Sequence, residues 1–147
     1  MANYCSNSVL FLGDAATVKA IHELFVHIES EQQRTRQYYL PEFVTADRGH
    51  MIDISLYQDK LSYETRWSPN LDLLVQIADH YGVDFIASFH EMVNGLYGEA
   101  LYQGRELKSL YRLAWAEEDL SDDAELSAMR DEQRLLIEKH AGPGYQR

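Results

Sequence analysis

The alternation of polar and less polar side chains is clearest just before the middle of the chain. From Leu61 to Trp67, the less polar residues occupy every second position. This period of two predicts a β-strand that buries one face. Ser68 and Pro69 follow at once. Serine favours the N-cap of a helix, and proline fits the first turn, where its missing N–H costs nothing. The segment therefore predicts a strand that leads directly into a helix.

Two segments have the helical period, with apolar residues three or four positions apart. The first follows Asp14, a good N-cap residue, and should extend from about Ala15 to Gln32 or beyond. The second follows Pro69 and ends at Gly82, which suits a left-handed C-cap. Each segment has one apolar stripe, so we expect both helices to pack on a sheet.

Six segments are predicted as strands from their alternation or their β-favouring apolar runs: residues 8–12, 52–57, 61–67, 83–92, 96–102 and 107–115. The second and third are close enough to form a hairpin, and Asn94-Gly95 is a strong turn signal between the fourth and fifth. Residues 33–50 have no clear period. We expect them to cross the surface, with Tyr38, Tyr39, Leu40 and Phe43 packing back on the core.

The first six predicted elements follow the order strand, helix, strand, strand, helix, strand. This order matches the split β-α-β topology called ferredoxin-like. We therefore predict an α+β fold with a ferredoxin-like βαββαβ antiparallel sheet, a β extension and a C-terminal helix. One sheet face is left for solvent, for the tail or for a partner. Residues 1–116 form the predicted domain, and residues 117–147 form an acidic C-terminal helix and tail packed on or next to it.

The charge of the chain narrows the classes of partner. The sequence has 147 residues, of which 24 are acidic and 13 are basic, giving a net charge of -11. Such a surplus repels phosphate backbones, which disfavours direct nucleic-acid binding and favours a basic protein surface. Much of it lies in one stretch, which we predict as candidate partner-binding residues: Glu117, Glu118, Asp119, Asp122, Asp123 and Glu125. The alternative is that this stretch is only a solvated helix start.

The chain has no recognisable catalytic or cofactor signature. Cys5 is the only cysteine, which excludes an internal disulfide and a cysteine-rich zinc site. The six histidines form no metal-binding motif, and the single Gly13-Asp14 step is too little for a phosphate-binding loop. We therefore expect no enzymatic activity, no metal and no cofactor. The sequence shows no signal peptide and no membrane span, and we expect a cytoplasmic protein.

Three segments together resemble a known family. Residues 2–9 contain an Asn-aromatic-Cys-x-Asn stretch, Gly13 closes the first strand, and Thr65-Arg66-Trp67-Ser68-Pro69 precedes the second helix. In this order they resemble the YubB-type ferredoxin-like domain of plasmid and phage proteins, over roughly residues 2–102. Asn70 stands where that family tends to have a second proline. The resemblance implies the fold and a mobile-element origin, and it implies no activity and no catalytic residues.

Two classes of function are left open. The first is a non-enzymatic accessory protein of a phage or plasmid that acts by protein–protein binding on a host protein with a basic surface. An acidic inhibitor of a host defence or nucleic-acid-handling protein is one form of it. The second is a small-ligand-binding or regulatory ferredoxin-like domain that acts as a homodimer. An apolar pocket with convergent polar groups would favour the second class.

The Trp67-Ser68-Pro69 step is predicted to be a structural anchor. The alternative places Trp67 in an aromatic binding surface with Tyr57, Tyr97 and Tyr102. For a buried tryptophan, we expect Trp67→Ala to lower the free energy of unfolding by about 3–5 kcal/mol, measured by denaturant titration. A variant with wild-type stability that has lost partner binding would show that Trp67 has a binding role instead.

Overall fold

The computed structural model describes residues 4–45, 50–66, 68–93, 95–113 and 124–141. These residues form nine elements: β1 (Tyr4–Leu12), α1 (Ala15–Thr35), β2 (Ile52–Tyr57), β3 (Lys60–Arg66), α2 (Leu71–Tyr81), β4 (Asp84–Glu91), β5 (Leu96–Gln103), β6 (Glu106–Leu113) and α3 (Ala124–Ala141). The order confirms the predicted α+β fold, in which the β extension and the C-terminal helix follow the βαββαβ unit.

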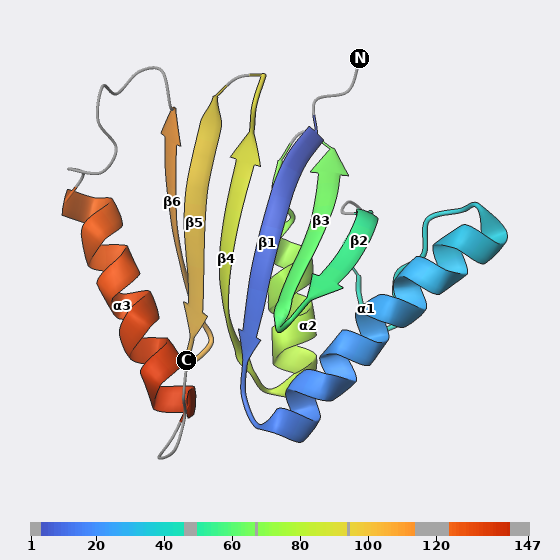
Figure 1. Cartoon of the computed structure of the whole chain (residues 1–147), viewed down its shortest axis with the longest axis horizontal. Helices are drawn as coiled ribbons and strands as arrows, with labels where there is room; N and C mark the ends of the chain where they lie inside the picture. Colours follow the sequence, from blue (N-terminus) through green and yellow to red (C-terminus); the bar gives the residue numbers. More distant parts are fainter. Residues whose placement is uncertain (1–3, 46–49, 67, 94, 114–123, 142–147) are drawn as a thin grey trace.

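A six-stranded antiparallel sheet forms the centre of the fold (Figure 1). Its strand order is β2-β3-β1-β4-β5-β6, so β1 lies between β3 and β4. The first four strands have the order expected of a ferredoxin-like fold. β5 and β6 then extend the sheet beyond β4 by successive antiparallel pairs.

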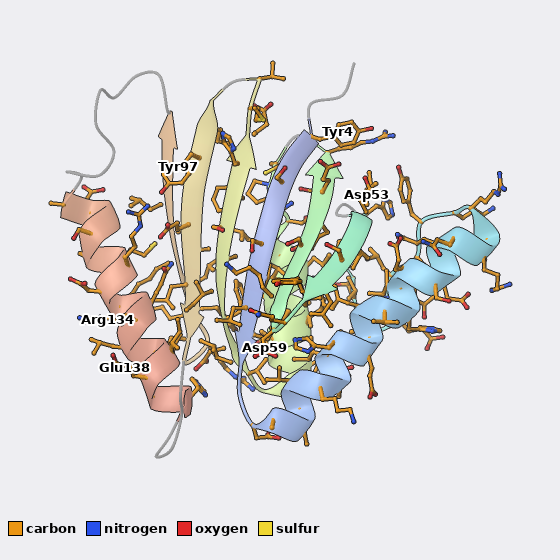
Figure 2. The ribbon with its side chains drawn as sticks, in the orientation of Figure 1. Tyr4, Asp53, Asp59, Tyr97, Arg134 and Glu138 are labelled. Atoms are coloured by element: carbon orange, nitrogen blue, oxygen red, sulfur yellow. The ribbon has the colours of Figure 1, made fainter. Side chains whose placement is uncertain are left out.

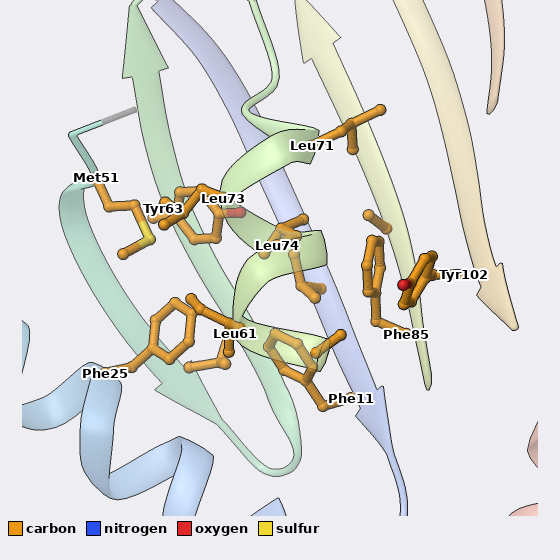
Figure 3. Close-up of a cluster of buried hydrophobic side chains, with 14 of the residues drawn as sticks. Phe11, Phe25, Met51, Leu61, Tyr63, Leu71, Leu73, Leu74, Phe85 and Tyr102 are labelled. Atoms are coloured by element: carbon orange, nitrogen blue, oxygen red, sulfur yellow. The ribbon is translucent and has the colours of Figure 1, made fainter. Parts of the chain in front are cut away.

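α1 and α2 cover one face of the sheet and enclose the main core (Figure 3). The ring of Phe25 on α1 lies 5.9 Å from the ring of Phe11 and 6.2 Å from that of Tyr63. The ring of Phe85 lies 6.0 Å from that of Phe11 and 5.3 Å from that of Tyr102. These aromatic contacts join α1 to β1, β3, β4 and β5. Each large side chain buried in this way stabilises the fold by about 1.5–3 kcal/mol.

The first helix begins and the second helix ends at the predicted residues. The Asp14 carboxylate accepts a hydrogen bond from the backbone N–H of Thr17 at 3.0 Å, which is the geometry of an N-cap. α2 ends at Gly82, which has a φ of 68° and is the C-cap. A residue with a side chain would be strained in this left-handed conformation, so glycine fits the position.

The prediction that Ser68 caps α2 is wrong, because the N-cap is Asn70 and the helix begins at Leu71. The backbone N–H of Ser68 donates to the carbonyl oxygen of Arg66 at 2.8 Å, and the carbonyl oxygen of Ser68 accepts from the Thr65 hydroxyl at 2.7 Å. The backbone N–H and carbonyl oxygen of Ser68 are therefore both hydrogen-bonded in a turn at the end of β3. The prediction that Pro69 lies in the first turn of this helix is also wrong, because Pro69 precedes the N-cap Asn70.

The connection between α1 and β2 packs back on the core, as predicted, except at one residue. Tyr39, Leu40 and Phe43 are partly buried against the core, and the Phe43 ring stacks on His80 of α2 at 3.8 Å. Tyr38 is instead 47% exposed and stacks on His50. These contacts hold the described part of the connection close to the domain.

α3 packs on the sheet face opposite α1 and α2, at the β5–β6 end of the sheet (Figure 1). Leu136 and Ile137 of α3 contact Leu12 of β1 and Leu101 of β5. The Lys108 ammonium also lies 3.1 Å from the Glu132 carboxylate. The tail helix therefore covers part of the second face. The predicted domain boundary, between residues 116 and 117, lies outside the described residues and stays a prediction.

A single buried leucine should hold α3 in place. Leu136 is 1% exposed, whereas its neighbour Leu135 is 59% exposed. Truncating a buried leucine costs about 2–5 kcal/mol, so Leu136→Ala should release α3 and speed amide hydrogen exchange along it. The control, Leu135→Ala, should leave exchange unchanged. Equal protection of α3 in the two variants would contradict this assignment.

Candidate functional site

Among the described residues, α3 covers the β5–β6 end of the second sheet face and leaves open the part over β3, β1 and β4. This open part contains a hollow of about 690 Å³, which we call the serine trough. Its floor consists of Ser6, Ser8, Ser62 and Ser88, and its rim includes Asp53, Glu64, His90 and Tyr97. The even-numbered residues of β1, β3 and β4 point to this face, because odd-numbered residues of the same strands are buried in the core.

Two rows across the sheet bring these side chains together. The first row consists of Glu64, Ser6, His90 and Tyr97, on β3, β1, β4 and β5. The second row consists of Ser62, Ser8 and Ser88. Cβ atoms of directly opposite residues are about 4.5–5.5 Å apart, so neighbours in a row can share a ligand. Serine is the smallest side chain in either row, and its repetition leaves the hollow.

Tyr97 forms the wall of the serine trough on the α3 side (Figure 2). Its hydroxyl accepts a hydrogen bond from Nη2 of Arg130 on α3. Arg130 also donates from Nε to the Glu99 carboxylate at 3.2 Å, and Gln133 donates to the other oxygen of Glu99 at 3.3 Å. The hydrogen bond that Arg130 donates to Glu99 raises the pKa of Arg130, so the guanidinium keeps its charge. α3 therefore fixes the orientation of Tyr97.

Two carboxylates lie at the other side of the serine trough. Asp53 has a φ of 54°, at an irregularity in the β2–β3 pairing between Ile52 and Ser55. A bulge of this kind redirects a side chain, and positive φ outside glycine is often found at functional sites. Within the described ranges, neither Asp53 nor Glu64 takes part in a salt bridge. Figure 2 shows Asp53 and Tyr97 on opposite sides of β1.

The serine hydroxyls of the floor are available for hydrogen bonds. No hydrogen bond joins the side chains of Ser6, Ser8, Ser62 or Ser88 to another residue that the structure describes. Each hydroxyl can donate one hydrogen bond and accept two. The floor therefore offers four adjacent groups of mixed donor and acceptor character.

The two sequence motifs meet on the core side of the sheet, beneath the serine trough. Nδ2 of Asn7 donates to the Thr65 hydroxyl at 3.0 Å and to the carbonyl oxygen of Cys5 at 2.9 Å. The Thr65 hydroxyl then donates to Ser68, as described above. This buried network joins β1 to β3 and to the turn before α2. The residue pattern behind the family resemblance thus has a structural role.

The predicted partner-binding set is only partly within the described residues. Glu125 lies in the first turn of α3 and is exposed. Five other members lie outside the described residues, as does Trp67: Glu117, Glu118, Asp119, Asp122 and Asp123. Ser68 is exposed and Pro69 is half-buried. The structure places none of the described members among the residues that line the serine trough.

The aromatic binding surface offered as an alternative is wrong for its described members. Tyr102 is 4% exposed and stacks on Phe85 in the core. Tyr97 belongs to the opposite sheet face, because it is an odd number of positions from Tyr102 along β5. Tyr57 is exposed at the end of β2, away from both. The three tyrosines therefore share no surface.

Sequence reasoning missed the serine trough, although a signal was present. Serines occupy the positions opposite the apolar face in three separate predicted strands. Only the strand order β3-β1-β4 makes them neighbours. The predicted ferredoxin-like topology already implies that order. Combining the polar face of each strand with the topology would have located the serine trough.

The ranges that the structure describes contain no cluster of three side chains suited to a metal ion. In the same ranges, no helix is long and apolar enough to cross a membrane.

A family comparison accounts for much of the chain. The family model described as "Ferredoxin-like domain in Api92-like protein" matches residues 45–133. The matched segment begins before β2 and ends within α3, so it includes the acidic stretch that lies beyond the motif resemblance at residues 2–102. Comparisons with curated proteins and with solved structures gave no match. Because the family model matches more than half of the 147 residues, the chain belongs to the family of the ferredoxin-like domain in Api92-like protein.

Proposed function

We propose that this chain is a non-catalytic binding protein whose ligand occupies the serine trough. The observation that carries the proposal is the hollow of about 690 Å³, with four unpaired hydroxyls at its floor and Tyr97, His90 and Glu64 at its rim. Ligand sites are typically concave, about 300–1,000 Å³ in volume, and contain a few convergent polar groups. The serine trough fits this description and lies on the central strands of the sheet.

The order of side chains in the first row argues against a serine hydrolase. In such an enzyme the histidine contacts the serine on one side and the acid on the other. Here Ser6 lies between Glu64 and His90, on the central strand of the three. The backbones of Glu64 and His90 are thus two strand spacings apart, about 9–10 Å, and no hydrogen bond or salt bridge joins their side chains. In this arrangement the carboxylate does not orient the imidazole.

The cysteine also lacks the properties of a nucleophile. Cys5 is fully buried in the core, and burial raises the pKa of its thiol from 9.0 to about 11. A catalytic cysteine needs the opposite shift, because the thiolate is the reactive form. This supports the proposal of a protein without a catalytic step.

A second candidate function is protein–protein binding by an accessory protein of a phage or plasmid. The net charge of -11 favours a host partner with a basic surface, and the resemblance to YubB-type domains supplies the mobile-element setting. An acidic inhibitor of a defence or nucleic-acid-handling protein is one form of it. A cytoplasmic location and a homodimer are compatible with either candidate.

The pKa of Cys5 gives a direct test of its buried, inert state. At pH 8 the native thiolate fraction should be about 100-fold below that of the unfolded chain, so iodoacetamide should modify Cys5 only in denaturant. As the pH rises from 9 towards 11, the unfolded thiol ionises first, and its contribution to stability is lost. Mass spectrometry of the alkylated protein measures the rate. Rapid modification of the native protein at pH 8 would contradict the assignment.

Filling the serine trough should remove ligand binding without unfolding the protein. Ser88 is exposed at the floor, so Ser88→Trp should block the hollow at little cost in stability. A ligand-observed NMR screen of amines, sugars, nucleosides and short peptides should give ligands that bind wild type and lose at least about 10-fold in affinity with Ser88→Trp. Circular dichroism would verify that the variant remains folded.

The matched control is Ser109→Trp, which places the same side chain at an exposed position of β6 outside the serine trough. It should bind like wild type. If every ligand is insensitive to Ser88→Trp, the serine trough is not the binding site. A protein complex that ignores Ser88→Trp, but weakens with salt and with neutralisation of residues 117–123, would favour the second candidate.

A further inference from the structure

The charges and surfaces of the serine trough specify a class of ligand. We infer that the serine trough binds an arginine side chain presented by an extended segment of a partner protein. This inference rests on the proposed function of the serine trough and adds the identity of its occupant. It is carried by the carboxylates at one side, the rings at the other, and the hydroxyl floor between them.

The carboxylates supply the attraction for a cation. Glu64 is partly buried in the first row, and Asp53 lies on the neighbouring strand β2 at the rim. Neither has a basic partner within the described part of the chain. Arg130, on the α3 side, donates its hydrogen bonds to Glu99 and Tyr97 instead. A partly buried carboxylate gains most from a cation that also donates hydrogen bonds.

The rings favour a guanidinium over an ammonium group. His90 and Tyr97 lie directly opposite each other on β4 and β5, in the same row as Glu64. Tyr97 is held in one orientation by Arg130. A planar guanidinium can stack on an aromatic ring while its N–H groups reach a carboxylate, whereas an ammonium is a compact point charge. One ligand side chain can therefore use both sides of the first row.

The floor favours a peptide as the carrier of that side chain. The hydroxyls of Ser62, Ser8 and Ser88 form a continuous row on three adjacent strands, next to Ser6. Backbone amides present donors and acceptors in alternation, and serine hydroxyls can satisfy both. The backbone of a peptide laid across the floor would replace its hydrogen bonds to water with hydrogen bonds to these hydroxyls. This part of the contact would need no charged group on the peptide. The hollow is also large enough for several residues rather than one side chain alone.

The same features disfavour phosphorylated ligands and nucleic acid. A phosphate in the serine trough would lie near the unpaired carboxylates of Asp53 and Glu64, in a protein of net charge -11. Both the local and the long-range fields repel it. The net charge of the chain would instead favour the approach of a basic partner, and Asp53 and Glu64 would attract its cation at the serine trough.

A selection experiment on the full chain tests the inference. Random peptides displayed on phage are selected on wild type and counter-selected on Ser88→Trp, so that enriched peptides depend on the serine trough. We expect the enriched peptides to share one arginine and to vary at most other positions. Calorimetry with a synthetic enriched peptide should show binding weakened at least about 10-fold when citrulline, which keeps the shape but not the charge, replaces arginine. Lysine at that position should be intermediate.

The protein side is tested by a matched pair of variants. Glu64→Gln should weaken the peptide about 10-fold or more and reduce the salt dependence of binding. Glu106→Gln removes the same charge from an exposed position of β6 and should change the affinity less than about twofold. The inference would be overturned if the enriched sequences contained no basic residue. It would also be overturned if the citrulline peptide bound with the same affinity as the arginine peptide. The absence of any enriched peptide would overturn it as well.

The two proposals can fail separately. If no arginine peptide binds, but the small-molecule screen yields a ligand that is lost in Ser88→Trp, the serine trough is a binding site with another occupant. If Ser88→Trp affects neither peptides nor small molecules, the proposed function itself is wrong. Loss of peptide binding in both Glu64→Gln and Glu106→Gln would indicate a general charge effect rather than a site, and would also overturn the inference.

Discussion

The pairing of β1 with β3 on one side and β4 on the other is the constraint on which the rest of the structure depends. It makes β1 the central strand that joins the β2–β3 hairpin to β4. Successive residues of β1 then point to opposite faces, so one strand contributes both to the aromatic core and to the serine floor. A shift of one residue in this register would exchange the two sets, and burial of Val9 and Phe11 opposes that shift. The network of Asn7 and Thr65 fixes the same register with hydrogen bonds.

The position of α3 makes the second face asymmetric. A four-stranded ferredoxin-like sheet leaves its second face open, but here β5 and β6 widen the sheet and α3 covers the added part. The helix is held by a small apolar contact around Leu136 and by polar contacts to Glu99, Asp84 and Lys108. The same helix fixes Tyr97. The extension of the fold by β5, β6 and α3 therefore also supplies the wall of the serine trough.

The acidity of the chain and the geometry of the serine trough point to the same kind of ligand. Long-range repulsion disfavours anions, and under the proposed function the carboxylates of Asp53 and Glu64 act in the same direction at short range. The buried polar groups on the core side have a different role, because Asn7 and Thr65 satisfy one another and hold a turn. The polar residues of β1 thus divide by face: those facing the helices stabilise the fold, and those facing outward can bind.

The sequence by itself determined the elements and their order, because period-two and helical patterns, Asp14 and Gly82 are local signals that adjacent residues enforce. It also determined which strand faces are apolar. The cap of α2 at Asn70 could not be read from the sequence, because Ser68 is drawn into a turn by its contact with Thr65. Nor could the serine trough be read directly, because its side chains come from β1, β3, β4 and β5 and become neighbours only through strand pairing. Local patterns determine which side of its strand or helix each residue occupies. Long-range strand pairing determines which residues become neighbours, and a binding site depends on this pairing.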